Sequence, residues 1–403
     1  MTKPAPQSRA EADLLGPVHD HSGERHYLDH ASSAPLRPEA ARAITAWIEE
    51  RHSGDPARVH VEGHVVRDAI ERAREAVAVL WATTPSRVVF TSGGTEAANT
   101  AVFAAGAARP GAPMICANVE HSCVREAAER HGPVTVLGVD SLGRIDLDHL
   151  ESLLAVRGGP SALVNCQWAS HEVGTVQPVT EVVTLCRAAG VPVHIDASAA
   201  LGHLRVELDA LGADFVSTSG HKLGGPPGSG ALYVKKGMRL APFLIGGAQE
   251  RARRAGAENV LGIVGLGAAA AALCETGRLE TEEATAWRLT RALLEAATSL
   301  GGVEPLGDTV TRVPHIVNVA VGGVLAEAVL LGLDRAGIAA HSGSACSSES
   351  IEPSPVLAAM GVDPDRSLRL SVGWPSTDDD VAAFAAAFPA VVERLRALGS
   401  AKP

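Results

Sequence analysis

Short apolar runs rich in β-forming residues alternate with longer segments of helical period between residue 36 and about residue 236. This alternation predicts an α/β fold with a largely parallel sheet. Seven apolar runs are strand candidates for one large sheet, at residues 87–92, 113–118, 134–139, 162–168, 191–196, 214–219 and 230–235. Helical runs with apolar residues three and four positions apart are predicted to cover both faces of this sheet, at residues 65–80, 95–108, 122–130 and 179–188.

The pattern changes in the second half of the chain. An alanine-rich helical region spans residues 258–300, and strand candidates then alternate with helices at residues 312–321, 338–342 and 367–372, before a last helix that ends at Leu398. This arrangement indicates a second, smaller α+β domain. We expect three parts in the chain, namely a flexible tail at residues 1–26, a large domain at 27–275 and a small domain at 276–403.

Charge and hydropathy narrow the function classes. Lys plus Arg number 35 and Asp plus Glu number 46, a formal net charge of -11, whereas a nucleic-acid-binding domain usually has the opposite balance. The most apolar stretch, residues 261–274, is interrupted by glycines and is shorter than the roughly 20 residues that a membrane-spanning helix needs. The first 26 residues contain no apolar run typical of a secretory signal. We therefore expect a cytoplasmic protein that binds neither membranes nor nucleic acid.

The cysteines point to a reducing compartment. Six of them are scattered through the chain without any CxxC pair. This spacing favours free thiols over a disulfide framework or a structural zinc site, and we expect no bound metal.

A lysine follows the strand predicted at residues 214–219. Lys222 closes the run Ser219-Gly220-His221-Lys222, directly before a turn rich in glycine and proline. A lone lysine is ordinarily a solvated surface residue. The residues that follow two other predicted strands favour a different interpretation.

Asp196 is the last residue of one predicted strand, and Gly94 and Thr95 open a helix directly after another. The carboxyl ends of strands in an open α/β sheet form the edge where ligands bind. Free N–H groups at a helix start, together with a hydroxyl, suit a phosphate. Each feature alone also fits a turn-forming aspartate or a capped helix. Together with the lysine they match the needs of pyridoxal 5'-phosphate, because an acid keeps the pyridine nitrogen protonated and a lysine binds the aldehyde.

With these residues in view, the chain resembles a cysteine desulfurase of the class V aminotransferase fold, in the branch that serves nitrogen fixation and iron–sulfur cluster assembly. The resemblance extends from Tyr27 to Leu398. Its motifs are Tyr27-Leu28-Asp29, Gly54-Asp55-Pro56, Phe90-Thr91-Ser92-Gly93-Gly94-Thr95-Glu96, Glu120-His121, His171-Glu172-Val173-Gly174, Asp196-Ala197, Ser219-Gly220-His221-Lys222, Ser342-Gly343-Ser344-Ala345-Cys346-Ser347-Ser348 and Glu352-Pro353-Ser354.

The resemblance implies a homodimer with the type I fold of pyridoxal-phosphate-dependent transferases. It implies that Lys222 is the Schiff-base lysine, that Asp196 pairs with the pyridine nitrogen, and that His121 stacks on the ring and takes part in acid–base steps. For His121 the alternative is a histidine that only satisfies the start of a helix.

Further roles follow from the same resemblance. Arg369 matches the arginine that binds the substrate carboxylate, and its alternative is a charge at a strand edge. His171 would lie beside the cofactor ring. The phosphate would be held by four residues, Gly94, Thr95, Ser219 and His221.

Cys346 distinguishes a desulfurase from its relatives. It stands in a run of serine and glycine that cannot pack well, so we expect a mobile and exposed thiol that can carry sulfur. In the implied reaction the Cys346 thiolate attacks the sulfur of L-cysteine bound to the cofactor. The products are L-alanine and a Cys346 persulfide for a sulfur-acceptor protein whose identity is open. We expect inert core thiols at four other positions and leave Cys123 undecided, the four being Cys116, Cys166, Cys186 and Cys274.

Three positions depart from the family pattern. His171 stands where asparagine is more common, Ala199 where glutamine reaches the ring hydroxyl, and Ala257 where threonine reaches the phosphate of the partner subunit. The two alanines remove hydrogen-bond donors. One alternative is a related C–S or selenocysteine lyase, or an aminotransferase, in which Cys346 is incidental. The other, motivated by the two alanines, is a catalytically degenerate partner-binding protein.

Overall fold

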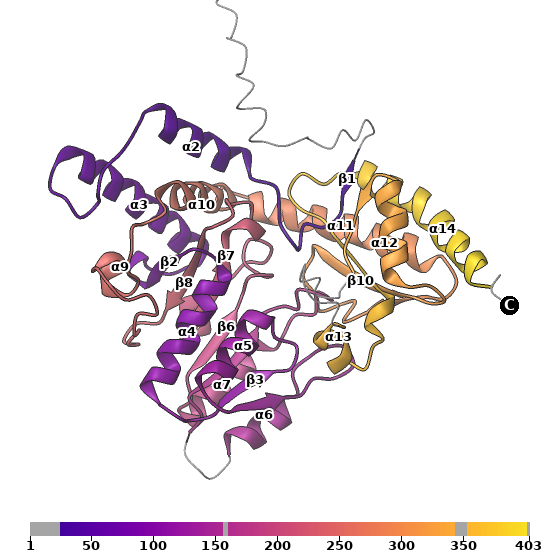
Figure 1. Ribbon diagram of the computed structural model, residues 1–403, viewed down its shortest axis with the longest axis horizontal. Coiled ribbons are helices and arrows are strands. Elements are labelled where there is room, and N and C mark those ends of the chain that lie inside the picture. The colour runs from indigo at the N-terminus through magenta and orange to yellow at the C-terminus, as the bar shows by residue number, and fades with distance from the viewer. Residues whose placement is uncertain (1–24, 156–159, 343–352, 401–403) are drawn as a thin grey trace, which may run out of the picture.

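The computed structural model describes residues 25–155, 160–342 and 353–400. Almost all of the predicted tail, and Cys346 with its neighbours, lie outside these residues. Figure 1 shows two units side by side, a larger one built around a broad sheet and a smaller one that contains the C-terminal helix.

The large sheet contains the seven predicted strands, in the order β2-β8-β7-β6-β5-β3-β4. Strand β8 runs antiparallel to both of its neighbours, and every other pair is parallel. The predicted α/β fold with a mostly parallel seven-stranded sheet is therefore confirmed. The strands are β2 (Val88–Thr91), β3 (Met114–Ala117), β4 (Val134–Leu137), β5 (Leu163–Gln167), β6 (Val193–Asp196), β7 (Phe215–Ser219) and β8 (Gly230–Val234).

Both faces of this sheet are buried, which explains the continuous apolar runs. Alternate residues of each strand face two different groups of helices. Helices α4 (Gly94–Ala108) and α5 (Ser122–His131) cover one face. The other face packs against α3 (Val61–Leu80), α6 (Leu147–Leu154), α7 (Val179–Ala189) and α10 (Val260–Leu273).

Helix α10 crosses α3 and α2 (Pro38–Glu49) at very short range. A Cβ atom added to Gly267 would lie 2.5 Å from Ala73 Cα, so this crossing needs glycine. The helical region predicted at 258–300 consists of two helices, α10 and α11 (Arg278–Thr298), with a bend of 81° between them.

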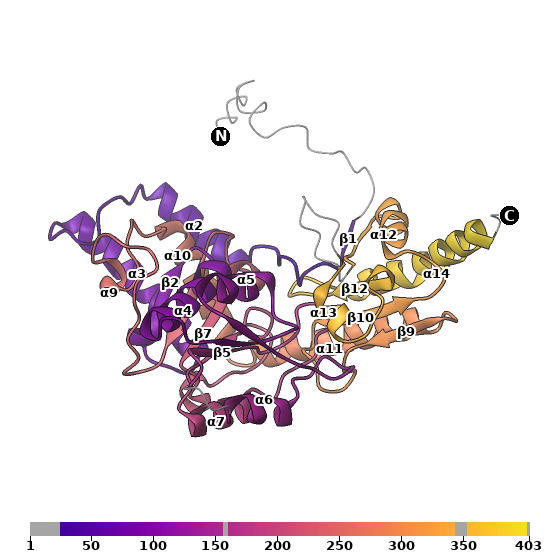
Figure 2. The same ribbon diagram turned by 60° about the horizontal axis from the view of Figure 1, so that its bottom comes forward.

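The smaller unit has its own sheet and its own core. Strands β9 (Val303–Leu306), β10 (Ile316–Val321) and β12 (Ser367–Ser371) form an antiparallel sheet in the order β12-β10-β9. Helices α11, α12 (Ala326–Arg335) and α14 (Asp378–Ser400) pack on it, as Figure 2 shows. The shorter helices of the chain are α8 (Leu208–Leu211), α9 (Gln249–Ala252) and α13 (Pro355–Ala359).

Two details differ from the expected arrangement. The strand predicted at 338–342 is only β11 (Ile338–Ala339), and it pairs in parallel with β1 (His26–Tyr27) instead of joining the three-stranded sheet. Leu28, next to β1, packs in the core of the smaller unit. The start of the expected large domain therefore contributes to the small one.

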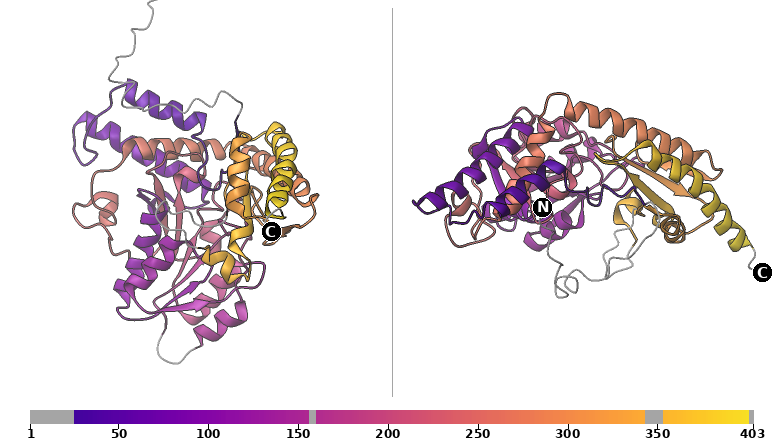
Figure 3. Two further views of the ribbon diagram at one scale, coloured as in Figure 1. Left: turned by 45° about the vertical axis from the view of Figure 1, so that its right-hand side comes forward. Right: turned by 90° about the horizontal axis from the view of Figure 1, so that it is seen from above.

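We still propose a domain boundary near residue 275. Helix α10 packs on α2 and α3 of the large unit, whereas α11 packs on α14 and β10 of the small unit. Figure 3 shows α11 running from one unit along the other. Arg37, before α2, is held by Glu282 of α11 through two hydrogen bonds of 2.8 and 2.6 Å, so the two units are tied together.

Among the described helices, none is by itself long and apolar enough to cross a membrane, although the bent pair α10 and α11 reaches the required length and composition when taken together.

Candidate active site

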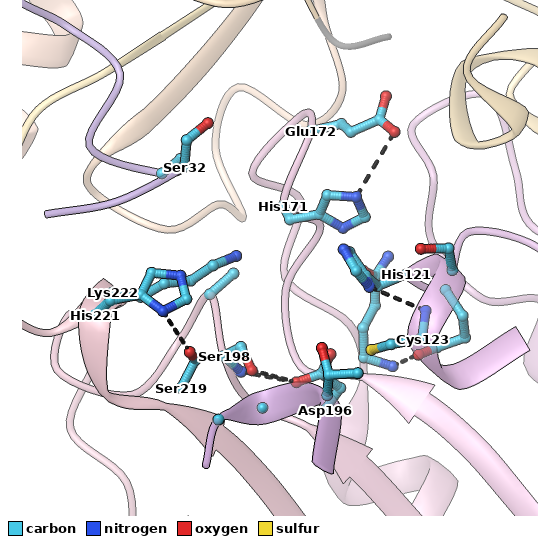
Figure 4. Close-up of a pocket in the computed structure, with 18 of the residues that line it drawn as sticks. Ser32, His121, Cys123, His171, Glu172, Asp196, Ser198, Ser219, His221 and Lys222 are labelled. Carbon is cyan, nitrogen blue, oxygen red and sulfur yellow. Dashed lines mark hydrogen bonds and ion pairs between the residues drawn. The ribbon is translucent and has the colours of Figure 1, made fainter. Parts of the chain in front are cut away.

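A cavity of about 620 Å³ opens where β2, β5, β6 and β7 end at one edge of the large sheet, facing the small unit. Its size is typical of a site for a small molecule. Nine residues assigned from the sequence line it, namely Gly94, Thr95, His121, His171, Asp196, Ser219, His221, Lys222 and Arg369. In Figure 4, Lys222 and His221 face His121 and Cys123 across the cavity, with Asp196 at the sheet edge below and His171 above.

Lys222 ends a tight turn, Gly220–Lys222, directly after β7. Its carbonyl oxygen is 3.3 Å from His203 Nε2, which fixes the backbone. Within the described residues its amine has no hydrogen bond or ion pair. Burial lowers the pKa of Lys222, and the charge of Asp196 opposes this effect. The free amine is a nucleophile, so a lowered pKa favours covalent chemistry at this position.

Asp196 is fixed from the sheet side. Its Oδ1 atom accepts hydrogen bonds from Ser198 N at 3.0 Å, Ser198 Oγ at 2.7 Å and Ser217 Oγ at 3.3 Å. Ser217 Oγ also lies 2.9 Å from Nε2 of His194, whose Nδ1 is 3.0 Å from Asn165 Oδ1. Burial lowers the pKa of His194 to about 4, so its ring is neutral. This buried polar chain holds the carboxylate at the strand end.

The start of α4 forms an anion-binding surface. Gly93 provides no side-chain cap there, so the first N–H groups of the helix stay open. A Cβ atom on Gly94 would lie 3.0 Å from Ser198 Oγ and 3.3 Å from Ser219 Cβ, so only glycine leaves this surface accessible. Ser219 Oγ is 2.8 Å from His221 Nδ1, which orients both groups at the same end of the cavity.

His121 has two roles at once. Its Nδ1 accepts a hydrogen bond from Cys123 N at 3.1 Å, so the ring caps the start of α5. It also lines the cavity, where its ring meets that of His171 edge to face at 5.1 Å between centroids. Burial lowers the pKa of His121. A neutral ring that accepts at Nδ1 carries its proton at Nε2.

His171 is supported by a buried carboxyl group. Glu172 Oε1 is 3.7 Å from His171 Nε2 and accepts a hydrogen bond of 2.9 Å from Ser354 Oγ. Burial raises the pKa of Glu172 to about 7, against the opposing effects of Ser354 and Arg369. Burial also lowers the pKa of His171 well below its usual range, so this ring is neutral as well.

We expect Glu172 to make stability depend on pH. In the unfolded chain this carboxyl titrates near 4.5, and in the folded protein at about 7. The folded state therefore holds the extra proton between these values, and stability falls as pH rises through that window, by on the order of 3 kcal/mol. Glu172→Gln should remove most of this fall in urea unfolding of the apoprotein at pH 5 and pH 7.5. Glu126→Gln, at an exposed position on α5, is the control and should keep it. An equal fall in stability between pH 5 and pH 7.5 in the Glu172 and Glu126 variants would contradict the assignment of this pH dependence to Glu172.

Arg369 is buried on β12 and points into the cavity, although β12 is an edge strand. Its Nη1 donates to His171 O at 2.8 Å, and its Nη2 donates to Asp29 Oδ1 at 2.8 Å and Ser32 Oγ at 2.6 Å. Its Nε is buried without a hydrogen-bond partner among the described residues. The guanidinium is thus fixed in place by three of its five N–H donors, and two donors, including the Nε–H, have no partner in the described structure.

Several residues of the cavity wall were missed by the sequence interpretation, and two of them have buried polar atoms without a partner in the described structure. Gln167 ends β5, pairs in register with Asp196, and has a buried Nε2 without a partner in the described structure. Arg125 follows His121 by one helical turn and also lines the cavity. Both positions had a signal, namely a polar residue at the end of a buried strand and the i, i+4 spacing from His121.

The cysteines divide into three groups. Cys116, Cys166 and Cys186 are buried, as predicted, and Cys274 is exposed, so its assignment to the core was wrong. Cys274 directly follows α10 as its C-cap, and the nearly uniform apolar sequence of that helix gives no solvent-facing side to read. Cys123 lines the cavity, and burial raises its pKa to about 12, so its thiol stays protonated at neutral pH.

The two alanine positions lie in different environments. Ala199 is buried in the cavity wall, where it offers no donor. Ala257 is exposed and does not line the cavity of its own chain.

The chain matches a known family over most of its length. Residues 26–384 match the family described as aminotransferase class-V. This chain belongs to the aminotransferase class-V family. It is 40% identical over 385 residues to a cysteine desulfurase of a Nostoc species, covering 93% of this chain and 95% of that one.

Two further relatives also match over most of the chain. The cysteine desulfurase IscS of Methanosarcina thermophila is 36% identical over 386 residues, covering 94% of each chain. A NifS-like protein from Rickettsia africae has a crystal structure that superposes with a TM-score of 0.84 at 28% identity, covering 92% of this chain and all of that one. The recognition of the family from the sequence motifs is confirmed.

The residues of the cavity fit pyridoxal phosphate, the cofactor of this family. An amine without a partner, a strand-end carboxylate and an open helix start are the groups that hold its aldehyde, ring nitrogen and phosphate. They are provided by Lys222, Asp196 and the first residues of α4, and all line the same cavity.

Proposed function

We propose that this class-V family member is a pyridoxal-phosphate-dependent cysteine desulfurase that converts L-cysteine to L-alanine and transfers the sulfur to Cys346. One observation carries the proposal. The unpaired amine of Lys222 and the fixed carboxylate of Asp196 face the same cavity, in a chain that is 40% identical to a cysteine desulfurase. Ala199 and Ala257 provide no side-chain hydrogen-bond donor for the cofactor, but the amine of Lys222 and the carboxylate of Asp196 are present.

We assign the binding roles as follows. Lys222 would hold the cofactor covalently, Asp196 would pair with the pyridine nitrogen and His121 would stack on the ring. Four cavity residues would hold the phosphate, namely Gly94, Thr95, Ser219 and His221, and His171 would lie beside the ring. Bound pyridoxal phosphate supplies an electron sink that stabilises negative charge at the substrate Cα atom.

The residues of the chain move the protons and orient the substrate. Lys222, with its lowered pKa, can take the proton from the substrate Cα atom and return one later. His121 carries its proton at Nε2 and can serve the reacting groups from the opposite wall. Arg369 binds the α-carboxylate, since its guanidinium is fixed by Asp29 and Ser32 before substrate arrives.

Cys346 receives the sulfur. Its thiolate attacks the sulfur of bound cysteine, so an S–S bond forms while the C–S bond of the substrate breaks. The electron pair of that bond stays on the substrate carbon, which takes a proton to give L-alanine. L-cysteine and the Cys346 thiol thus become L-alanine and a Cys346 persulfide. A sulfur-acceptor protein would then take the sulfur for a dedicated sulfur-transfer pathway.

We further propose a homodimer in the cytoplasm. Ala257 is exposed on its own chain, which supports a position near a partner subunit. The five described cysteines are free thiols, which supports a reducing compartment.

The proposal is tested by product analysis. Purified protein loaded with pyridoxal phosphate should form L-alanine and sulfide from L-cysteine in equal amounts when a thiol reductant is present. Pyruvate with sulfide would indicate a lyase, and transfer of the amino group to a keto acid would indicate an aminotransferase. Protein that takes up no cofactor would indicate a partner-binding protein.

A further inference from the structure

Arg125 is a cavity arginine without a partner. It stands one helical turn after His121 on α5, and the hydrogen bond of 3.2 Å from Arg125 N to His121 O puts both side chains on one face of the helix. Its side chain lines the cavity, and its Nε is buried without a hydrogen-bond partner. Glu129, one turn further along, is exposed and forms no ion pair with it. Throughout the described residues the guanidinium has no ion pair or side-chain hydrogen bond.

Among the described residues, the nearby carboxyl groups form no ion pair with Arg125, although Glu120 Oε2 is itself buried without a hydrogen-bond partner. Glu120 Oε1 accepts a hydrogen bond from Gln167 N, and Glu172 accepts one from Ser354 Oγ. Burial raises the pKa of both carboxyl groups, in spite of the opposing charge of Arg125. The positive charge of Arg125 is therefore not neutralised by the wall around it.

The second cavity arginine differs in this respect. Arg369 is paired with Asp29 at 2.8 Å and comes from β12 of the small unit, whereas Arg125 comes from α5 of the large unit. One cavity thus has two guanidinium groups from different units, and among the described residues only that of Arg369 has a carboxylate partner. An arginine has five N–H donors, so an unpaired one in a cavity is suited to an anion.

We propose that Arg125 binds the anionic end of the substrate side chain, which for cysteine is the thiolate sulfur. The inference deepens the proposed function and rests on it, because it assigns Arg369 to the α-carboxylate. The ligand class is an L-amino acid with a short, negatively charged side chain. A cation beside the bound thiol also favours its thiolate form, and it offsets the repulsion between that sulfur and the attacking Cys346 thiolate.

The test compares two amino acids of the same shape, L-aspartate and L-asparagine. Their dissociation constants are measured on the holoprotein by calorimetry and by competition with L-cysteine. Wild-type protein should bind L-aspartate roughly 10-fold to 100-fold more tightly than L-asparagine, as expected for a hydrogen bond to a charged group. Arg125→Met should abolish this preference, and Arg125→Lys should keep part of it. Arg130→Met, an exposed arginine on the same helix, is the matched control and should keep all of it.

A second measurement addresses the thiolate. In Arg125→Met, the pH at which kcat for L-cysteine rises should move upward, because kcat reports the ionisation of the bound thiol and the cation that favours its thiolate is gone. Wild-type protein without a preference for L-aspartate would overturn the proposal, as would Arg125→Met with the preference intact. Binding of L-aspartate does not require sulfur transfer, so failure of the Arg125 assignment can be distinguished from failure of the proposed function. A protein that prefers L-aspartate but forms no L-alanine keeps this assignment and loses the proposed function.

Discussion

Lys222→Ala should stop the formation of L-alanine from L-cysteine and should release the cofactor on dialysis. The variant loses both the amine that holds pyridoxal phosphate and the base for the substrate Cα proton. Burial lowers the pKa of Lys222 and its amine has no partner among the described residues, so the substitution removes a free amine that is suited to both roles. The rate should fall at least roughly 10³-fold, the middle of the range of about 10²-fold to 10⁴-fold for removal of a general acid–base group alone.

The measurement combines turnover with the visible absorbance of bound cofactor after dialysis. Lys222→Arg keeps the positive charge but offers no nucleophilic amine, and it should be equally inactive. Lys236→Ala, an exposed lysine shortly after β8, is the matched control and should keep both cofactor and rate. A Lys222→Ala protein that converts cysteine at the wild-type rate would show that the amine lies outside the reaction.

The large sheet was predictable because both of its faces are buried. All four residues of β2 (Val88–Thr91) and all four of β3 (Met114–Ala117) are buried, and all of them except Thr91 are apolar, so these strands are visible in the sequence as apolar runs. The binding motifs follow directly after these runs. Their position at one sheet edge then follows from the parallel topology.

The small unit was harder to predict for two physical reasons. Strand β9 (Val303–Leu306) contains a proline and has two exposed residues, because it is an edge strand, and edge strands lack a continuous apolar run. Strand β1 (His26–Tyr27) has only two residues and pairs with β11 at the other end of the chain. A pairing so distant in sequence has no local signal.

The site, too, could be predicted only in part, because some of its features depend on contacts between distant residues. The loss of a donor at Ala199 is visible in the sequence, but the amide of Gln167 on the same cavity wall becomes visible only through the register that pairs it with Asp196. Arg125 resembles any helical arginine until the absence of a partner and the burial of its Nε are known. Residue types are read from the sequence, whereas unpaired groups are a property of the fold.

Cys346→Ala should retain the cofactor but lose persulfide formation, and L-alanine formation should fall on the order of 100-fold or more. The expected split arises because the cofactor is held by Lys222 and Asp196, whereas the sulfur needs a separate thiolate to attack it. Cys346 lies outside the described residues, so its role rests on the family motif alone.

The remaining thiols define the control and the outcome that would contradict this prediction. Cys123 is the described cysteine that lines the cavity, but burial raises its pKa to about 12, so it stays protonated at neutral pH and cannot replace the lost thiolate. Cys274→Ala, which removes an exposed thiol outside the cavity wall, should leave persulfide formation unchanged. Sulfur is followed by mass spectrometry of the intact protein after brief exposure to L-cysteine, which adds one sulfur atom to wild-type protein. The same added mass on Cys346→Ala would assign the sulfur to another thiol, with Cys123 then the first to map by peptide digestion.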